Sequence, residues 1–256
     1  MPLASQRFDN LLAQANQVSR ARLLAAADRD SGCWLNVVPI PVLGTYLKPE
    51  ELRIAISLRV GAQVCQPHTC KCRRPVDTLG HHLLSCRFNE GRHPRHAALN
   101  DTVCRALKTA GLPSILEPVG LDRGDGWRPD GLTVFPFKRG LSLCWNATCV
   151  NTFGESVINR SAVSAGTAAS EAERAKKAKY PLLCQRFQFE PIAFETAGTF
   201  GPGTRIILNE IGARLRERTG DKREGMWLKQ RLAISVQRGN ALTIISSAKH
   251  FTELTD

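Results

Sequence analysis

The chain has 256 residues, with 35 lysines and arginines against 23 aspartates and glutamates, so its formal net charge is +12. A hydrophobic content of 43% excludes disorder for the chain as a whole, and the length allows one large domain or two small ones. No run approaches about 18 uninterrupted apolar residues, so no membrane-spanning helix is expected. Because 25 of the cations are arginine, whose flat guanidinium suits phosphate oxygens, the charge favours nucleic acid as the partner.

The nine cysteines indicate an intracellular protein. The N-terminus lacks a positively charged start followed by an apolar run, so no secretory signal is expected. The odd count and uneven spacing are unlike a disulfide framework. We therefore expect a nuclear or cytoplasmic protein that is not secreted, in which most cysteines are small core residues and a tight cluster binds metal.

The first elements expected are helices. Residues 4–28 have apolar side chains at helical spacing, and residues 48–60 begin Lys-Pro-Glu-Glu, which is typical of a helix start. From 61 to 95 the periodicity stops, and Cys, His, Pro, Arg and Gly dominate. We expect an N-terminal helical segment over 1–64 and a zinc knuckle over 65–92.

Four residues in the second segment are of the kind that zinc prefers, spaced as Cys70-x-Cys72-x9-His82-x3-Cys86. Short spacers of this kind let a small loop close around a tetrahedral Zn²⁺ ion. His81 is the alternative imidazole ligand, and His82 is favoured over it. The residues between the ligands are charged or turn-forming and have no apolar core of their own, so this segment is expected to need its metal to fold.

After residue 93 the pattern is mixed α/β. Four strands are expected, at 114–119, 128–135, 141–150 and 186–196. Four helices accompany them, at about 94–110, 167–180, 204–218 and 225–238. This order implies a mixed sheet flanked by helices, in which the first three strands form a meander and the helix before the fourth is a crossover.

A polar constellation follows from this arrangement. Strand alternation places Asn146 on a polar face beside Asp130 of the neighbouring strand, and Glu117 precedes both. Lys176 and Lys179 share one face of the next helix. Metal-dependent nucleases use such groups, because carboxylates hold Mg²⁺ and a lysine orients or deprotonates the attacking water. The alternative is an ordinary Arg-Pro-Asp-Gly turn and a solvated, lysine-rich helix face.

The order of these pieces resembles the C-terminal region of non-LTR retrotransposon polyproteins that contain a restriction-like endonuclease. After the Cys/His cluster come Arg95-His96, Arg128-Pro-Asp130-Gly, Trp145-Asn-Ala-Thr148 and Ala172-Glu-Arg-Ala-Lys176-Lys-Ala-Lys179-Tyr180. The resemblance spans roughly 34 to 245. It implies a CCHC zinc knuckle followed by a restriction-endonuclease-like domain of the PD-(D/E)xK type over 93–256, which nicks target DNA for target-primed reverse transcription. No Tyr/Phe-x-Asp-Asp polymerase motif occurs in the chain, so reverse transcription is not expected of it.

One position departs from the family pattern, which has an acid directly after the tryptophan where this chain has Asn146. The resemblance implies Asp130 as the main Mg²⁺ ligand, Glu117 as an accessory acid, and Lys176 or Lys179 as the water-activating lysine. A neutral amide is a weak Mg²⁺ ligand, and losing one preorganised electrostatic group costs about a hundredfold or more in rate. We expect a weakened or inactive metal-dependent DNA endonuclease, with a non-catalytic nucleic-acid-binding zinc-knuckle protein as the alternative.

The cations expected to contact nucleic acid lie at two places in the chain. Arg92, His93, Arg95 and His96 follow the zinc segment, and Arg128 precedes Asp130. Contacts from such residues to phosphates of DNA, or of the RNA of the parent element, would make binding sensitive to salt.

Overall fold

The computed structural model describes residues 2–121 and 128–252. Its longer helices are α1 (Pro2–Gln14), α2 (Gln17–Ala27), α3 (Pro49–Val60), α4 (Arg92–Thr109), α6 (Thr167–Lys179), α8 (Pro202–Thr219) and α9 (Glu224–Thr252). Shorter helical turns are η1 (Cys33–Asn36), η2 (Pro41–Leu43), η3 (His81–Leu84), α5 (Ile158–Ser161) and α7 (Pro181–Arg186). The strands are β1 (His68–Thr69), β2 (Pro75–Val76), β3 (Ser114–Leu116), β4 (Gly131–Thr133), β5 (Leu143–Val150) and β6 (Gln188–Glu195). In the described ranges, no helix is long and apolar enough to cross a membrane.

The fold is mixed α/β, as expected. β3, β4, β5 and β6 form one sheet in that order, and β1 and β2 form a small antiparallel pair. β3 to β5 are antiparallel neighbours, whereas β5 and β6 are parallel and α6 lies between them in the chain. The meander and the crossover helix are therefore confirmed. β4 pairs only with Cys144 and Trp145 of β5, so the β4 side of residues 146–150 has no strand neighbour among the described residues.

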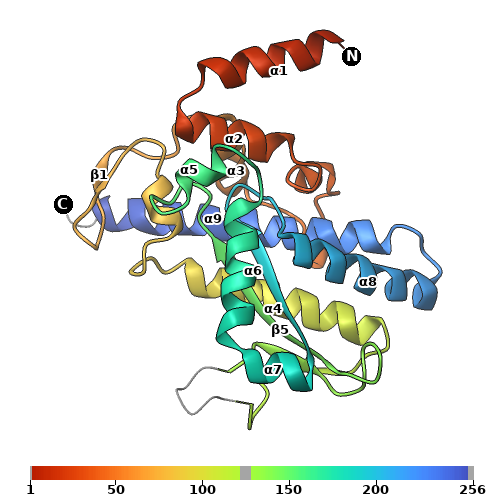
Figure 1. Ribbon diagram of the computed structural model, residues 1–256. Coiled ribbons are helices and arrows are strands. Elements are labelled where there is room, and N and C mark those ends of the chain that lie inside the picture. Colours follow the sequence, from red (N-terminus) through yellow and green to blue (C-terminus); the bar gives the residue numbers. More distant parts are fainter. Residues whose placement is uncertain (1, 122–127, 253–256) are drawn as a thin grey trace.

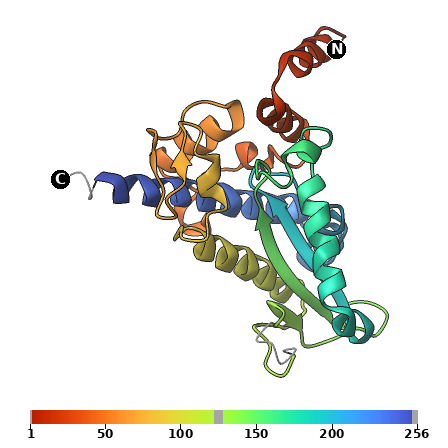
Figure 2. The same ribbon diagram turned by 60° about the vertical axis from the view of Figure 1, so that its left-hand side comes forward.

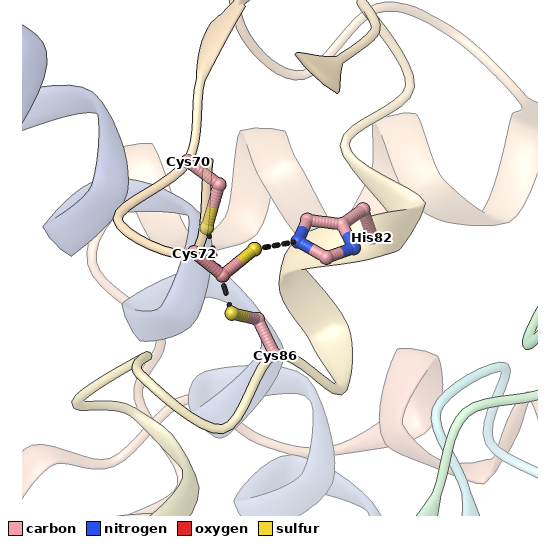
Figure 3. Close-up of side chains that lie close together, drawn as sticks. All are labelled: Cys70, Cys72, His82 and Cys86. Carbon is pink, nitrogen blue, oxygen red and sulfur yellow. Dashed lines mark hydrogen bonds between the residues drawn. The ribbon is translucent and has the colours of Figure 1, made fainter. Parts of the chain in front are cut away.

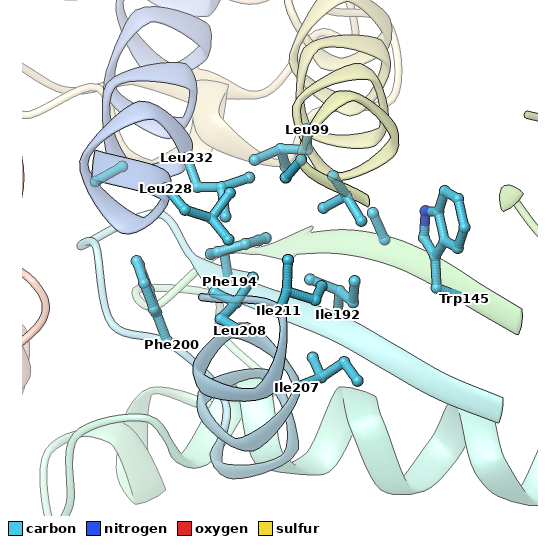
Figure 4. Packing of buried hydrophobic residues seen from close by; sticks show 14 of the residues in the cluster. Leu99, Trp145, Ile192, Phe194, Phe200, Ile207, Leu208, Ile211, Leu228 and Leu232 are labelled. Atoms are coloured by element: carbon cyan, nitrogen blue, oxygen red, sulfur yellow. The ribbon is translucent and has the colours of Figure 1, made fainter. Parts of the chain in front are cut away.

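Helices cover both faces of this sheet (Figures 1 and 2). Alternation along β5 turns Leu143, Trp145 and Ala147 toward the main core, where they meet apolar residues of α4, α8 and α9 (Figure 4). Cys144 lies on the opposite face, in a smaller cluster that includes Tyr180 at the end of α6. The face of β5 that includes Cys144 and Asn146, which the sequence predicts to be polar, is thus the face that α6 covers.

The N-terminal and zinc segments pack into the same clusters as the rest of the chain. Trp34 belongs to the main core. Leu83 and Leu84 of the zinc segment are buried with Ile54 of α3 and Ile244 of α9. The zinc segment therefore buries its apolar residues against neighbouring helices, and the division at 64 and 92 stays a prediction.

Two helix boundaries differ from expectation. The periodicity over 4–28 predicts one helix, but Asn16 caps a second one by accepting a hydrogen bond from the backbone N–H of Ser19 at 2.8 Å. α9 continues beyond the expected end at 238. Gly239 lies within this helix and does not end it. A Cβ at this position would lie 2.5 Å from the Cβ of Arg95, so a larger residue would not fit there. This glycine instead allows the close approach of α4 to α9.

Candidate metal centre and nucleic-acid interface

The four expected zinc ligands converge in the structure (Figure 3). Sγ of Cys70 lies 3.5 Å from Sγ of Cys86, and Sγ of Cys72 lies 3.0 Å from Nε2 of His82. All four ligand atoms lie within 4.8 Å of one another, a spacing suited to a tetrahedral ion with Zn–S bonds of about 2.3 Å. These residues, named here the Cys3His cluster, could hold a metal such as zinc.

Local backbone geometry brings the ligands together. Arg73 adopts a left-handed conformation with φ 68°, and its N–H donates to the carbonyl oxygen of Cys70 at 2.7 Å, which closes the turn between β1 and β2. Gly80, with φ 63°, precedes η3, and its N–H donates to Oδ1 of Asp77 at 3.0 Å. The first turn presents Cys70 and the second presents His82.

The environment of the cluster suits a metal. Burial raises the pKa of the Cys70 thiol to about 12, so a bound cation would be needed to keep it as the thiolate. Burial, together with the charge of Arg74, lowers the pKa of His82, which favours the neutral imidazole that binds metal.

The structure distinguishes His82 from the alternative ligand. The ring of His81 stacks on Phe153 with centroids 4.0 Å apart, and burial lowers its pKa to about 4. His68 also lies elsewhere, with Nε2 2.8 Å from Oγ of Ser247. The Cys3His cluster therefore includes His82 and neither of the other two histidines of the segment.

The carboxylate of Asp130 joins α4 to β5. Its Oδ2 accepts a hydrogen bond from the backbone N–H of Ala147 at 2.7 Å and lies 3.0 Å from Nε2 of His96. Since Gly131 pairs with Trp145, the register brings Asp130 opposite Asn146. Asn146 is 4% exposed, and its Oδ1 has no hydrogen-bond partner among the described residues.

Lys176 of α6 lies near this carboxylate. Burial lowers the pKa of Lys176, the charge of Asp130 opposes that shift, and Lys179 adds to it. The hydrogen bond that His96 donates to Asp130 raises the pKa of His96, although burial and the charge of Lys176 oppose this. Asp130, His96 and Lys176 therefore form one electrostatic unit.

Trp145 explains why a glycine follows Asp130. A Cβ on Gly131 would lie 2.0 Å from Cζ2 of the Trp145 ring, so only glycine fits beneath the indole. Nε1 of Trp145 donates to Oδ1 of Asn100 at 3.0 Å, and Nδ2 of Asn100 lies 3.3 Å from Nε2 of His96. Asn100 was not among the expected site residues, although it is one helical turn after His96.

Other expected acids and lysines have different surroundings. The backbone N–H of Glu117 donates to the carbonyl oxygen of Asp130 at 2.8 Å, but its carboxylate pairs with Arg128. Nζ of Lys179 lies 6.0 Å from the centroid of the Tyr180 ring. Glu173, in the same helix, accepts hydrogen bonds from the first turn of α8, including the N–H of Thr204 at 2.8 Å, and so has a structural role.

Arg95, which is expected from the sequence to contact nucleic acid, is almost fully buried, although it also lines the basic pocket described below. It is 3% exposed, and its guanidinium donates to Oδ1 of Asn240 at 2.7 Å and to the carbonyl oxygen of Leu84 at 3.2 Å. Arg95 thus ties the zinc segment and α4 to α9, because it lies on the inner side of α4.

A basic pocket of about 350 Å³ opens beside Asp130. It lies between the end of the zinc segment, the first turn of α4 and the open edge of β5. Its lining residues are Arg87, Arg92, His93, Arg95, His96, Thr148 and Cys149. Arg92, His93, Arg95 and His96 are expected from the sequence to contact nucleic acid, whereas Arg87 is not, since nothing local relates residue 87 to residue 148.

No protein-family model matches the chain, and no curated protein matches it.

Proposed function

We propose that the chain is a DNA-binding domain with a metal-dependent endonuclease centre weakened by Asn146, as its resemblance to retrotransposon endonucleases implies. We further propose zinc as the metal of the Cys3His cluster and the nucleus as the place of action. The observation that supports this function best is the position of Asp130, which lies opposite Asn146 and contacts His96, a lining residue of the basic pocket.

The residues at this centre fit weak cation binding. The carboxylate of Asp130 and the buried Oδ1 of Asn146, which has no hydrogen-bond partner in the part of the chain that the structure describes, are oxygen ligands of the kind that Mg²⁺ takes. Mg²⁺ would polarise the phosphodiester and lower the pKa of a water. His96 orients the carboxylate of Asp130, and Lys176 is placed to orient the attacking water. The centre has one carboxylate, that of Asp130, beside the basic side chains of His96 and Lys176. It therefore lacks the negative charge that binds Mg²⁺ tightly.

The basic pocket supports a second candidate, binding of DNA without cleavage. Its described lining includes arginines and histidines and no carboxylate. Phosphate contacts from such residues need no Mg²⁺. Both candidates therefore predict salt-sensitive binding, and only the first predicts Mg²⁺-dependent nicking.

A plasmid-nicking assay in Mg²⁺ separates the two candidates. We expect Asn146→Asp to nick at least about a hundredfold faster than the natural chain, because it restores the missing carboxylate. Asp130→Ala, alone or combined with Asn146→Asp, should abolish nicking, and the combined variant controls for a contaminating nuclease. If Asn146→Asp folds, binds DNA and gains no nicking, the endonuclease proposal is wrong and the binding candidate remains.

A further inference from the structure

The basic pocket has features of a phosphate site. Arg92 and His93 are exposed in the first turn of α4, and Arg87 is exposed on the segment that leads to it. The N-cap residue of this helix is Gly91, so no N-cap side chain covers the backbone N–H groups of the first turn. The pocket has a volume of about 350 Å³, and its arginines make its charge positive.

The open edge of β5 adds a backbone donor to this pocket. In a strand, N–H groups two residues apart point to the same side. The N–H of Ala147 points away from β6 and donates to Asp130. The N–H of Cys149, a lining residue, therefore also points away from β6, at an edge with no strand neighbour among the described residues.

The Cys3His cluster and α9 flank the segment that contains the two arginines. Arg87 directly follows the ligand Cys86. The segment that leads on to Arg92 is held on α9, because Nδ2 of Asn89 donates to the carbonyl oxygen of Thr243 at 2.6 Å. A Cβ on Gly91 would lie 2.7 Å from the backbone nitrogen of Thr243, so the segment has little room to shift.

We propose that the basic pocket binds the DNA backbone phosphate adjacent to the one at Asp130, and that the Cys3His cluster holds Arg87 and Arg92 in position for this contact. His96 relates the two positions, since it both contacts Asp130 and lines the pocket. A strand that places one phosphate at Asp130 thereby brings its neighbour to the arginines. The inference rests on the DNA-binding part of the proposed function.

The test is fluorescence anisotropy of a labelled duplex DNA titrated at several salt concentrations without Mg²⁺. We expect the double variant Arg87→Ala/Arg92→Ala to bind about tenfold or more weakly at low salt, with a salt slope smaller by about one per cation removed. Lys222→Ala is the matched control, because Lys222 is an exposed cation in the turn before α9, at the far end of that helix from the zinc segment. Equal affinity and slope in the double variant and in Lys222→Ala would overturn the proposal.

The cluster's part is tested with Cys86→Ser, whose zinc content and helical circular dichroism are measured first. We expect a zinc-free, folded variant to show the same loss of affinity as Arg87→Ala/Arg92→Ala. If it binds DNA like the natural chain, the cluster does not position the arginines. Should Cys86→Ser not fold, the same comparison is made with His82→Asn, which changes the ligand on η3 and leaves the sequence beside Arg87 intact.

The outcomes separate this inference from the endonuclease proposal. Loss of binding in the arginine variant, with no nicking by Asn146→Asp, supports the pocket and refutes the endonuclease. Nicking by Asn146→Asp, with normal DNA binding when both arginines are removed, supports the endonuclease and refutes the pocket.

Discussion

Nε2 of His96 lies 3.0 Å from Oδ2 of Asp130, so a side chain of α4 contacts the carboxylate that precedes β4. The N–H of Ala147 in β5 donates to the same oxygen. Two elements thus fix the carboxylate where the pairing of β4 with β5 ends. His96 both contacts Asp130 in the proposed endonuclease centre and lines the basic pocket. A substitution of His96 is therefore expected to affect both.

Lys176 is expected to matter for catalysis and its neighbour Lys177 is not. Lys176 is half-buried near Asp130, and burial lowers its pKa. Lys177 is exposed and pairs with Glu190 at 3.1 Å. In the Asn146→Asp background, we expect Lys176→Ala to reduce plasmid nicking about a hundredfold or more, and Lys177→Ala to change it less than about tenfold. Similar losses in both variants would mean that Lys176 acts only through its charge.

Zinc content should distinguish the two adjacent histidines. His82→Asn removes one of four ligands, so the purified variant should contain about one equivalent of zinc less than the natural chain. Cys72→Ser should behave in the same way. His81→Asn is the control, because His81 stacks on Phe153 outside the cluster. Metal analysis of the three variants checks this, and zinc loss in His81→Asn alone would contradict the assignment of His82.

Local patterns were sufficient for the Cys3His cluster and for the strand order. The Cys3His cluster lies within 17 residues, so its spacing specifies most of its geometry. The sheet follows from strand periodicity and from the helix between β5 and β6. Glycines were harder to interpret, since Gly239 resembles a helix end in the sequence and proves to be a point of close packing against Arg95.

The basic pocket could not be derived from local patterns. Arg95 and His96 are adjacent in the sequence but point about 100° apart on α4, so one is buried against α9 and the other reaches Asp130. Which side of a helix faces the core depends on packing partners far along the chain. For the same reason the proximity of Arg87 to Thr148 has no signal in the sequence.

Gly131→Ala should destabilise the protein by disturbing Trp145. The added methyl group would lie 2.0 Å from the indole ring, so the ring must move and its hydrogen bond to Asn100 is lost. We expect a cost of about 2–3 kcal/mol in the free energy of unfolding, measured by urea denaturation, with a change in tryptophan fluorescence. Gly154→Ala is the control, because its new Cβ would meet no atom closer than 3.4 Å. Equal costs in both variants would show that the contact with Trp145 is unimportant.

Asp30 should stabilise the fold in a pH-dependent way. Its buried carboxylate contacts Nε of Arg205 at 2.7 Å and Nζ of Lys229 at 3.3 Å. Asp30→Asn should cost about 2–3 kcal/mol at pH 7, since it leaves two largely buried cations with less negative charge. Asp101→Asn, which removes an exposed pair with Arg105, should cost less than about 0.5 kcal/mol.

The pH dependence follows from the pKa of Asp30. Burial alone would raise this pKa, but the hydrogen bond from Arg205 and the charge of Lys229 outweigh it and hold the pKa below its ordinary value of 3.8. Because the folded pKa is lower than the unfolded one, the ionised carboxylate stabilises the fold above about pH 4, and this contribution disappears as the pH falls through the folded pKa. Urea denaturation at a series of pH values should therefore show a constant difference between the natural chain and Asp30→Asn from about pH 8 to 5, and a smaller one below about pH 4. A difference that stays unchanged down to about pH 3 would show that the ion pair contributes nothing beyond packing.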